Sequence, residues 1–183
     1  MQFTNKAIKQ GLVDTETDQN EQLWRLQAPS AEDGLKVNKL VAQTEALDDN
    51  STYCNFLQAI HFQDTSIAAF YKGRLAGFVS GYLKPNQPST LFIWQVVVDR
   101  DFRGQGVAKK MLSRLLEREN LHSINAIETT ITEDNLASWS LFRGIEKEKG
   151  EQGNVSVFLD HDVHFEGQHE TEHLYRILLK NTH

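Results

Sequence analysis

The chain has 183 residues, a formal net charge of −6 and a hydrophobic content of 39%. This length suits one compact domain, which we place at residues 21–183, after a flexible tail over residues 1–20. The acidic balance and the lack of a Lys/Arg-rich face argue against nucleic-acid or anionic-membrane partners. No apolar run approaches the roughly 20 residues that a membrane span needs, and no secretory signal is visible. The single cysteine, Cys54, rules out an internal disulfide and favours a reducing, cytoplasmic location.

Hydrophobic periodicity predicts strands and helices in the order β-α-α-β-β-β-α-β-α-β-β. The strands are expected at Leu23–Gln27, Thr65–Tyr71, Leu75–Leu83, Leu91–Val98, Ile124–Ile131, Val155–Phe158 and about Leu174–Leu179. The helices are expected from a Ser30 cap to near Thr44, with Leu35, Val37, Leu40 and Val41 as its apolar stripe, then at about Ser51–Ile60, Gln105–Glu119 and from Asn135 onward. A hairpin turn is predicted at residues 72–74, a connection at residues 84–89, and a charged loop at Glu146–Gly153.

A glycine loop, Arg103-Gly-Gln-Gly-Val-Ala108, joins the fourth predicted strand to a helix. That helix carries an apolar face of Ala108, Met111, Leu112, Leu115 and Leu116. Gly104 and Gly106 permit positive φ and let a ligand approach the main chain, because no Cβ blocks it. The first turn of the helix then offers unpaired N–H groups to an anion, with Arg103, Lys109 and Lys110 adding positive charge. The loop therefore predicts a pyrophosphate site, with an ordinary turn as the alternative.

The spacing Arg103-x-x-Gly106-x-Ala108 resembles the coenzyme A loop of the GNAT N-acetyltransferase superfamily. The later string Asn135-Leu-Ala-Ser138 resembles the start of the next helix in that superfamily. The resemblance implies an α/β fold with a mixed, mostly antiparallel sheet that is flanked by helices and splayed where coenzyme A enters. It also implies acetyl-CoA as co-substrate, with no metal. The cofactor-binding residues would be Val96, Val97, Val98, Arg103, Gly104, Gln105, Gly106, Val107, Ala108, Lys109, Asn135, Ser138 and Phe142.

Four longer strings, at residues 47–55, 90–97, 128–139 and 165–173, resemble one branch of the superfamily, the L-2,4-diaminobutyrate acetyltransferases. This resemblance implies transfer of an acetyl group to the 4-amino group of L-2,4-diaminobutyrate, which yields N4-acetyl-L-2,4-diaminobutyrate, the precursor of ectoine. It also implies a homodimer, for which the apolar ending Leu174–Leu179 is a plausible interface. Another small diamine or amino acid as substrate, and a module that binds coenzyme A without catalysis, remain alternatives.

Two catalytic groups that are usual in the superfamily are missing here. Trp94 occupies the position of the usual Glu base, and Phe142 that of the usual Tyr acid. Candidates for the acid and base are Glu172, Asp48 and Tyr53, and a relayed water could also accept the proton. The substrate carries two ammonium groups and one carboxylate, so its pocket needs both hydrogen-bond acceptors and donors. Substrate contacts are expected from Asp48, Asp49, Tyr53, Asn55, Trp94, Gln95, His169 and Glu172. Asp48 and Asp49 could equally be helix-start residues, and Trp94 could belong to the core.

The string His169-Glu-Thr-Glu-His173 fits the H-E-x-x-H pattern of zinc hydrolases. That chemistry requires both histidines on one helix and a further ligand, for which His161 or His164 is available. The preceding Gly167 and the strand-like sequence from Leu174 argue against the helix. A zinc hydrolase is therefore kept as an alternative, together with adventitious metal binding by these histidines.

Overall fold

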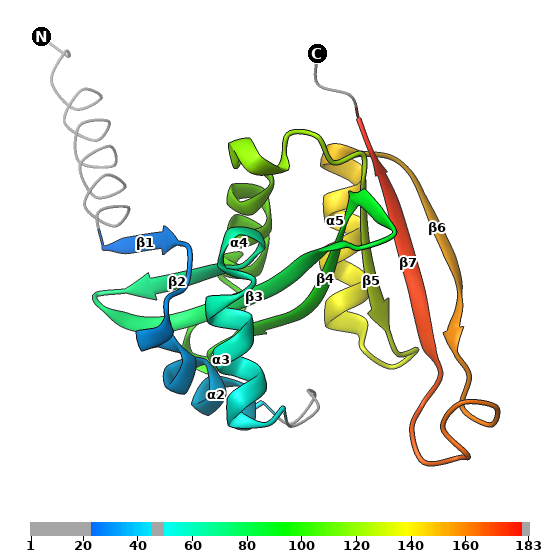
Figure 1. Cartoon of the computed structure of the whole chain (residues 1–183), viewed down its shortest axis with the longest axis horizontal. Helices are drawn as coiled ribbons and strands as arrows, with labels where there is room; N and C mark the ends of the chain where they lie inside the picture. Colours follow the sequence, from blue (N-terminus) through cyan, green and yellow to red (C-terminus); the bar gives the residue numbers. More distant parts are fainter. Residues whose placement is uncertain (1–22, 45–49, 181–183) are drawn as a thin grey trace, which may run out of the picture.

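The computed structural model describes residues 23–44 and 50–180 (Figure 1). The predicted tail, and Asp48 and Asp49, lie outside these residues. Within them, seven strands form one sheet in the order β1-β2-β3-β4-β5-β7-β6. The strands are β1 Trp24–Gln27, β2 Ile67–Tyr71, β3 Arg74–Lys84, β4 Gln87–Val98, β5 Ala126–Ile131, β6 Gly150–Leu159 and β7 Glu172–Leu179.

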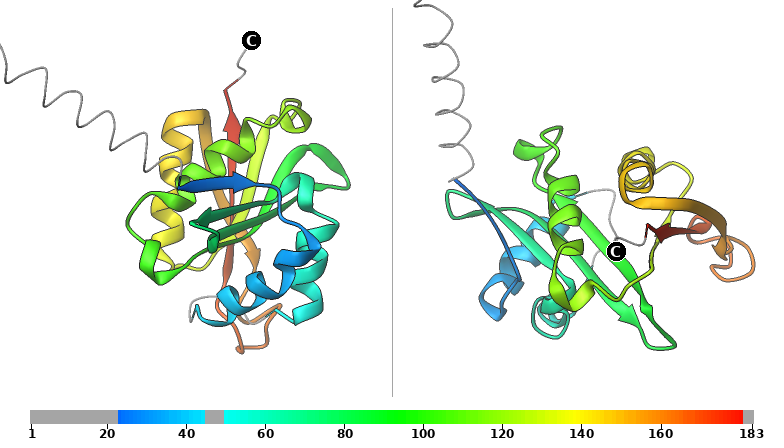
Figure 2. Two further views of the ribbon diagram at one scale, coloured as in Figure 1. Left: turned by 90° about the vertical axis from the view of Figure 1, so that its left-hand side faces the viewer. Right: turned by 90° about the horizontal axis from the view of Figure 1, so that it is seen from above.

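Helices cover both faces of this sheet (Figure 2). They are α2 Gly34–Ala42, α3 Thr52–Ile60, α4 Val107–Leu116 and α5 Leu136–Lys149. The larger hydrophobic core packs α4 and α5 against one face through residues such as Met111, Leu115 and Ile145. A smaller core packs Val37, Leu40 and Val41 of α2 against the other face. No helix in residues 23–44 and 50–180 has the length and apolar character needed to cross a membrane.

The sheet opens in its centre, between β4 and β5. These two strands pair in parallel from Thr90 to Phe92, opposite Ala126 to Glu128, whereas the other neighbouring strands pair antiparallel. Beyond Phe92 the two strands diverge, so the end of β4 keeps one edge that no strand covers (Figure 1). This arrangement confirms the predicted mixed, mostly antiparallel sheet and its splay.

Several predicted boundaries of helices and strands are wrong. The first helix is predicted to run from the Ser30 cap, but Ala31–Asp33 form a 3-10 turn and the α-helix begins only at Gly34. Leu35 is predicted to be part of the buried stripe of this helix, but it is 49% exposed. Another 3-10 turn at residues 63–65 delays the start of β2, and β4 begins at Gln87, so residues 85–86 alone form the turn after β3. Helix α4 begins only at Val107, since Gly106 adopts a left-handed conformation that a helix interior excludes. Val107 is buried on α4, while Ala108 and Leu116 are only half-buried.

The predicted loop at Glu146–Gly153 is also wrong, because α5 continues to Lys149 and β6 follows at once. Glu146 fastens this junction: its carboxylate accepts hydrogen bonds from the backbone N–H of Gly153 and from the hydroxyl of Tyr175. Gly150 is required by packing, because a Cβ there would lie 2.7 Å from a methyl group of Ile177. The glycines and charges that suggested a loop therefore serve a tight helix-to-strand junction.

Candidate active site

A cleft of about 500 Å³ lies where β4 and β5 separate, between the end of β4, the loop before α4 and the first turns of α5. Most of the predicted cofactor-binding residues line it: Val96, Val97, Val98, Arg103, Gly104, Gly106, Val107, Ala108, Lys109, Asn135 and Ser138. Sequence reasoning missed five further residues of the lining, namely Thr44, Phe102, Ala137, Ser140 and Leu141. Two of the missed residues on α5, Ala137 and Leu141, could have been found from the sequence. They lie one residue before and three residues after the predicted Ser138, and residues three and four apart share a helix face.

Two predicted cofactor-binding residues are placed differently. The side chain of Gln105 donates a hydrogen bond to the backbone oxygen of Asp101, 3.1 Å away, and does not line the cleft. Phe142 is 2% exposed and packs in the larger core, so its neighbour Leu141 faces the cleft instead. Because Phe142 is buried, the position at which the superfamily resemblance implies a tyrosine acid contributes core packing here.

The glycine loop has the backbone geometry that its sequence predicts. Gly104 and Gly106 have φ of +75° and +74°, and a Cβ on either would meet no heavy atom within 4 Å among the described residues. Gly106 directly precedes α4, and its carbonyl accepts the first helical hydrogen bond from Lys110 at 3.0 Å. No described side chain caps this helix start. The N–H groups of the first turn are therefore available to an anion in the cleft.

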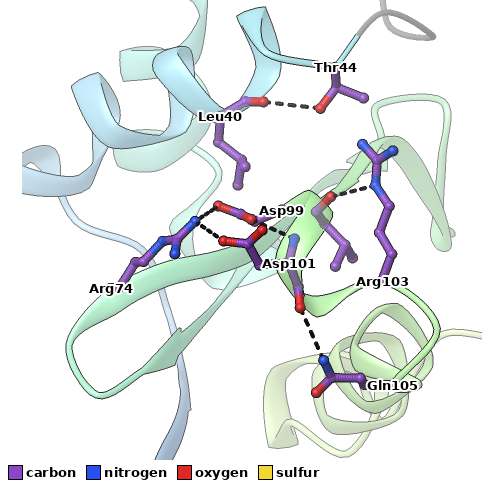
Figure 3. Close-up of polar contacts among 8 residues, drawn as sticks. Leu40, Thr44, Arg74, Asp99, Asp101, Arg103 and Gln105 are labelled. Carbon is purple, nitrogen blue, oxygen red and sulfur yellow. Dashed lines mark hydrogen bonds and ion pairs between the residues drawn. The ribbon is translucent and has the colours of Figure 1, made fainter.

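An ion-pair network connects β3 to the residues that follow β4 and precede the glycine loop (Figure 3). Arg74, at the start of β3, places its Nη2 atom 2.6 Å from Asp99 and 2.9 Å from Asp101. The other oxygen of Asp99 accepts a hydrogen bond from the backbone N–H of Asp101. Burial alone would raise the pKa of Asp99, but this backbone hydrogen bond and the Arg74 guanidinium outweigh it and lower the pKa. These contacts hold residues 99–101, which lead from β4 into the glycine loop.

The uncovered edge of β4 presents main-chain groups to the cleft. The backbone N–H of Asp99 donates to Ala76 of β3 at 2.9 Å, so Asp99 faces the sheet. Alternation along a strand then directs the N–H and C=O groups of Val96 and Val98 the opposite way. The carbonyl of Val98 accepts a hydrogen bond from Nε of Arg103 at 3.1 Å (Figure 3). An extended amide-containing chain in the cleft could pair with this edge as an added strand.

Trp94 lies on a bulge of β4, and its side chain is 44% exposed. Ser80 of β3 is opposite Gln95 while Gly81 is opposite Ile93, which leaves Trp94 as the extra residue. The indole packs edge-on against Phe62 and Tyr82, with ring centroids 6.4 Å apart in each case. Trp94 is therefore not a core residue but part of an aromatic surface. Gln95 points inward instead, and its side-chain oxygen is buried with no hydrogen-bond partner among the described residues.

Helix α3 carries the other predicted substrate contacts, and they differ in exposure. Tyr53 is 72% exposed, whereas Asn55 is completely buried. The side chain of Asn55 accepts a hydrogen bond from Asn38 and donates one to Gln58, both at 2.9 Å. Asn55 thus joins α3 to α2 through an amide chain. Cys54 between them is half-buried, and burial raises the pKa of its thiol, which does not favour a nucleophile.

The string 169–173 does not form a helix. His169 lies in the connection between β6 and β7, and its backbone oxygen is 2.7 Å from Nδ1 of His161. Glu172 and His173 begin β7, where both are half-buried and Nδ1 of His173 has no partner among the described residues. The described residues contain no group of three His, Cys, Asp or Glu side chains that could hold a metal. The zinc-hydrolase alternative thus loses the helix that it requires.

Taken together, a splayed sheet, an uncovered β4 edge and a glycine loop before an uncapped helix define an acyl-CoA-dependent N-acyltransferase site. The sequence pattern of the acetyltransferase (GNAT) family matches residues 21–145. The chain belongs to this family.

Among its relatives, the chain is 54% identical to L-2,4-diaminobutyric acid acetyltransferase of Vibrio cholerae over 159 residues, which cover 87% of this chain and 92% of that protein. It is 48% identical to the protein of the same name from Methylotuvimicrobium alcaliphilum, over 83% of this chain and 88% of that one. A solved structure of diaminobutyrate acetyltransferase EctA from Paenibacillus lautus, in complex with its substrate L-2,4-diaminobutyric acid and coenzyme A, matches with a TM-score of 0.81. It shares 38% identity and covers 85% of this chain and 95% of that one.

Proposed function

We propose that this protein transfers the acetyl group of acetyl-CoA to the 4-amino group of L-2,4-diaminobutyrate, giving N4-acetyl-L-2,4-diaminobutyrate, the precursor of ectoine. The observation that carries the proposal is the 54% identity, over nearly the whole chain, to a diaminobutyric acid acetyltransferase. The cleft supports it, because it offers main-chain donors where a pyrophosphate would lie and an open strand edge where a pantetheine would lie.

The residues of the cleft fit coenzyme A. The amides from Gly104 to Lys109 would hold its pyrophosphate, and the carbonyl of Val96 and the N–H of Val98 would pair with its pantetheine amides. Asn135 has a second role besides the predicted one, because its side chain caps α5 by accepting a hydrogen bond from the backbone N–H of Ser138 at 3.1 Å. Bound in this way, the thioester would lie beside the β4 bulge.

Acetyl transfer requires a neutral amine, whereas a free alkylammonium titrates at about 10. A general base must therefore remove a proton before the nitrogen attacks the thioester carbonyl. We assign this task to a group at the acceptor end, with Glu172, Asp48 and Tyr53 as the candidates. The N–H of Val96 would stabilise the oxyanion that forms, and coenzyme A would leave as the thiolate.

Trp94, Tyr53, His169 and the acidic side chains would line the acceptor pocket. The exposed indole of Trp94 offers an aromatic face to an ammonium group, an interaction worth about 0.5–2 kcal/mol depending on desolvation. Asp48, Asp49 and Glu172 would bind the ammonium charges. We expect Asp48→Ala and Glu172→Ala to raise the KM for the amine or to lower kcat while the affinity for coenzyme A stays nearly unchanged.

We further propose a cytoplasmic homodimer. The predicted interface, Leu174–Leu179, lies on β7, between β5 and β6, where Leu178 is 40% exposed. The adjacent edge strand β6 exposes Val155, Val157 and Phe158, but its register pairs Val155 with Tyr175 and Val157 with His173, so these two valines lie on the other face of the sheet from Leu178. Analytical ultracentrifugation, with Leu178→Lys as the test variant, measures whether the exposed face of β7 holds two copies together. A variant that remains dimeric would place the interface elsewhere.

The proposed reaction is tested by thiol release from acetyl-CoA with L-2,4-diaminobutyrate, lysine, ornithine and 2,3-diaminopropionate, with the product mapped by NMR. We expect the highest kcat/KM with diaminobutyrate and the acetyl group on N4. A higher kcat/KM with another diamine would identify that diamine as the substrate, and the protein would still be an acetyltransferase of the same family. Binding of coenzyme A without thiol release from any of these amines would instead favour a binding module without catalysis.

A further inference from the structure

Two cations surround one buried carboxylate on the sheet, in residues that have so far been given no role in the reaction, although one of the cations, Arg176, lies within the β7 segment proposed as the dimer interface. Glu128 of β5 is 2% exposed. Nζ of Lys84 lies 2.6 Å from one of its oxygens, and Nη1 of Arg176 contacts the other. Arg176 also lies 3.4 Å from the hydroxyl of Thr90. One cation would suffice to neutralise Glu128, so this cluster of Lys84, Glu128 and Arg176 carries one positive charge in excess.

The cluster shares a sheet face with the proposed acceptor pocket. Phe92 of β4 is opposite Glu128, which in turn is opposite Arg176. The ring of Tyr82 lies 5.2 Å from that of Phe92 and 6.4 Å from that of Trp94, so the aromatic surface around Trp94 runs directly to the cluster. On β7, Glu172 and Arg176 are four residues apart and therefore point to the same face. The side chains of Lys84 and Arg176 remain 30% and 33% exposed, which leaves them accessible to a ligand on this face.

The substrate of the proposed reaction carries a charge that the pocket does not yet match. The predicted contacts supply anionic groups, Asp48, Asp49 and Glu172, for the two ammonium groups, but they include no cation for the carboxylate. We propose that Arg176, supported by Lys84, binds the carboxylate of the diamino acid and so determines which end of the molecule reaches the thioester. This inference rests on the proposed function and adds the recognition of the carboxylate to it.

The dimensions are compatible with this assignment. An extended diaminobutyrate spans about 6 Å from its 4-nitrogen to its carboxylate oxygens. Two residues along β4, from Trp94 back to Phe92, span about 7 Å. A 4-amino group held near Trp94 thus directs the carboxylate toward the cluster. Binding there would balance the charges, because the two cations Lys84 and Arg176 would face two carboxylates, that of Glu128 and that of the substrate. The guanidinium of Arg176 suits this role, since a guanidinium can hold a carboxylate through two parallel hydrogen bonds.

The test compares the substrate with its decarboxylated analogue, 1,3-diaminopropane, in wild-type protein and in Arg176→Gln. The variant removes the charge on Arg176, and the analogue removes the charge that Arg176 is proposed to bind. We expect Arg176→Gln to lower kcat/KM for diaminobutyrate about tenfold to a hundredfold, the range for hydrogen bonds to charged groups. The value for 1,3-diaminopropane should change less than about twofold. For an amine that reacts too slowly, its inhibition constant replaces kcat/KM.

Three controls separate binding from folding. Arg143→Gln removes an arginine that instead covers the ring of Trp139 on α5, and it should leave both amines unaffected. Arg176→Lys should recover part of the activity toward diaminobutyrate. Lys84→Gln, which leaves Arg176 in place to pair with Glu128, serves if Arg176→Gln does not fold, and it should also weaken diaminobutyrate selectively.

An equal loss for the two amines would overturn the proposal and assign the cluster to structure alone. So would a selective loss of acetyl-CoA affinity. If the wild-type protein acetylates neither amine, the proposed function fails, and the carboxylate site fails with it. A wild-type protein that acetylates diaminobutyrate, with Arg176→Gln equally active, would refute the carboxylate site while leaving the function intact.

Discussion

Replacing Gly106 by alanine isolates the contribution of the loop backbone to cofactor binding. Gly106 has φ +74° and ψ +13°, and an added Cβ would meet no heavy atom within 4 Å among the described residues. The substitution therefore introduces no clash, and its cost is that of holding a residue with a Cβ in the left-handed region, about 1–2 kcal/mol. Without a ligand, the loop of the variant can relax to a conformation that avoids this cost. Binding of the cofactor must then restore the original conformation, so the cost appears as weaker binding of acetyl-CoA.

The expected result is a 5- to 30-fold higher KM for acetyl-CoA, the factor that corresponds to about 1–2 kcal/mol. The KM for the amine should stay constant, because the α4 start does not belong to the acceptor pocket. Gly106→Asn should lie between wild type and alanine, since asparagine tolerates the left-handed region better. Steady-state kinetics with each substrate varied in turn measures both constants.

Gly73→Ala provides a matched control. Gly73 has φ +82° in the turn between β2 and β3, and its Cβ would also meet no heavy atom within 4 Å in the described part of the chain. The same cost should appear there as a Tm lower by roughly 2–8 °C, with an unchanged KM for acetyl-CoA. Equal effects of both substitutions on that KM would refute the reasoning, as would a lower stability of Gly106→Ala with normal cofactor binding.

Arg74→Met removes the guanidinium that joins Asp99 to Asp101. We expect a several-fold higher KM for acetyl-CoA in steady-state kinetics, whereas the control Lys72→Met on the same hairpin should keep the wild-type KM. An effect of equal size in Lys72→Met would reject this role. The lowered pKa of Asp99 predicts stability that is present above about pH 4 and is lost as the pH falls through the folded-state pKa. Urea unfolding between pH 3 and pH 6 should therefore show a shallower pH dependence for Asp99→Asn, and identical curves would contradict the pKa assignment. Dialysis against a chelator should leave acetyl transfer intact, and activity restored only by zinc would revive the metal site.

The glycine loop and its neighbouring strand were predictable because their signals are local. Positive φ at Gly104 and Gly106 follows from the absence of a Cβ, and the start of a helix after them follows from the apolar periodicity. The order of strands and helices was predictable for the same reason. The resemblance to a family then placed the fold, since its motifs occur at matching positions along the chain.

Features that depend on distant contacts were not predictable in this way. Glu146 suggested a charged loop, yet it accepts hydrogen bonds from Gly153 and Tyr175 and holds a helix end. Arg74 lies 25 residues before Asp99 in the sequence, and nothing local indicates their ion pair. Similarly, the exposure of Trp94 depends on a bulge that is defined by the register with β3.

The central claim is that the amides from Gly104 to Lys109 hold the diphosphate of acetyl-CoA beside the splayed strands. A crystal structure of the protein with bound coenzyme A tests it most directly. We predict phosphate oxygens about 3 Å from several of these backbone nitrogens, and pantetheine along the edge of β4 at Val96 and Val98. A diphosphate bound anywhere else on the molecule would contradict the account.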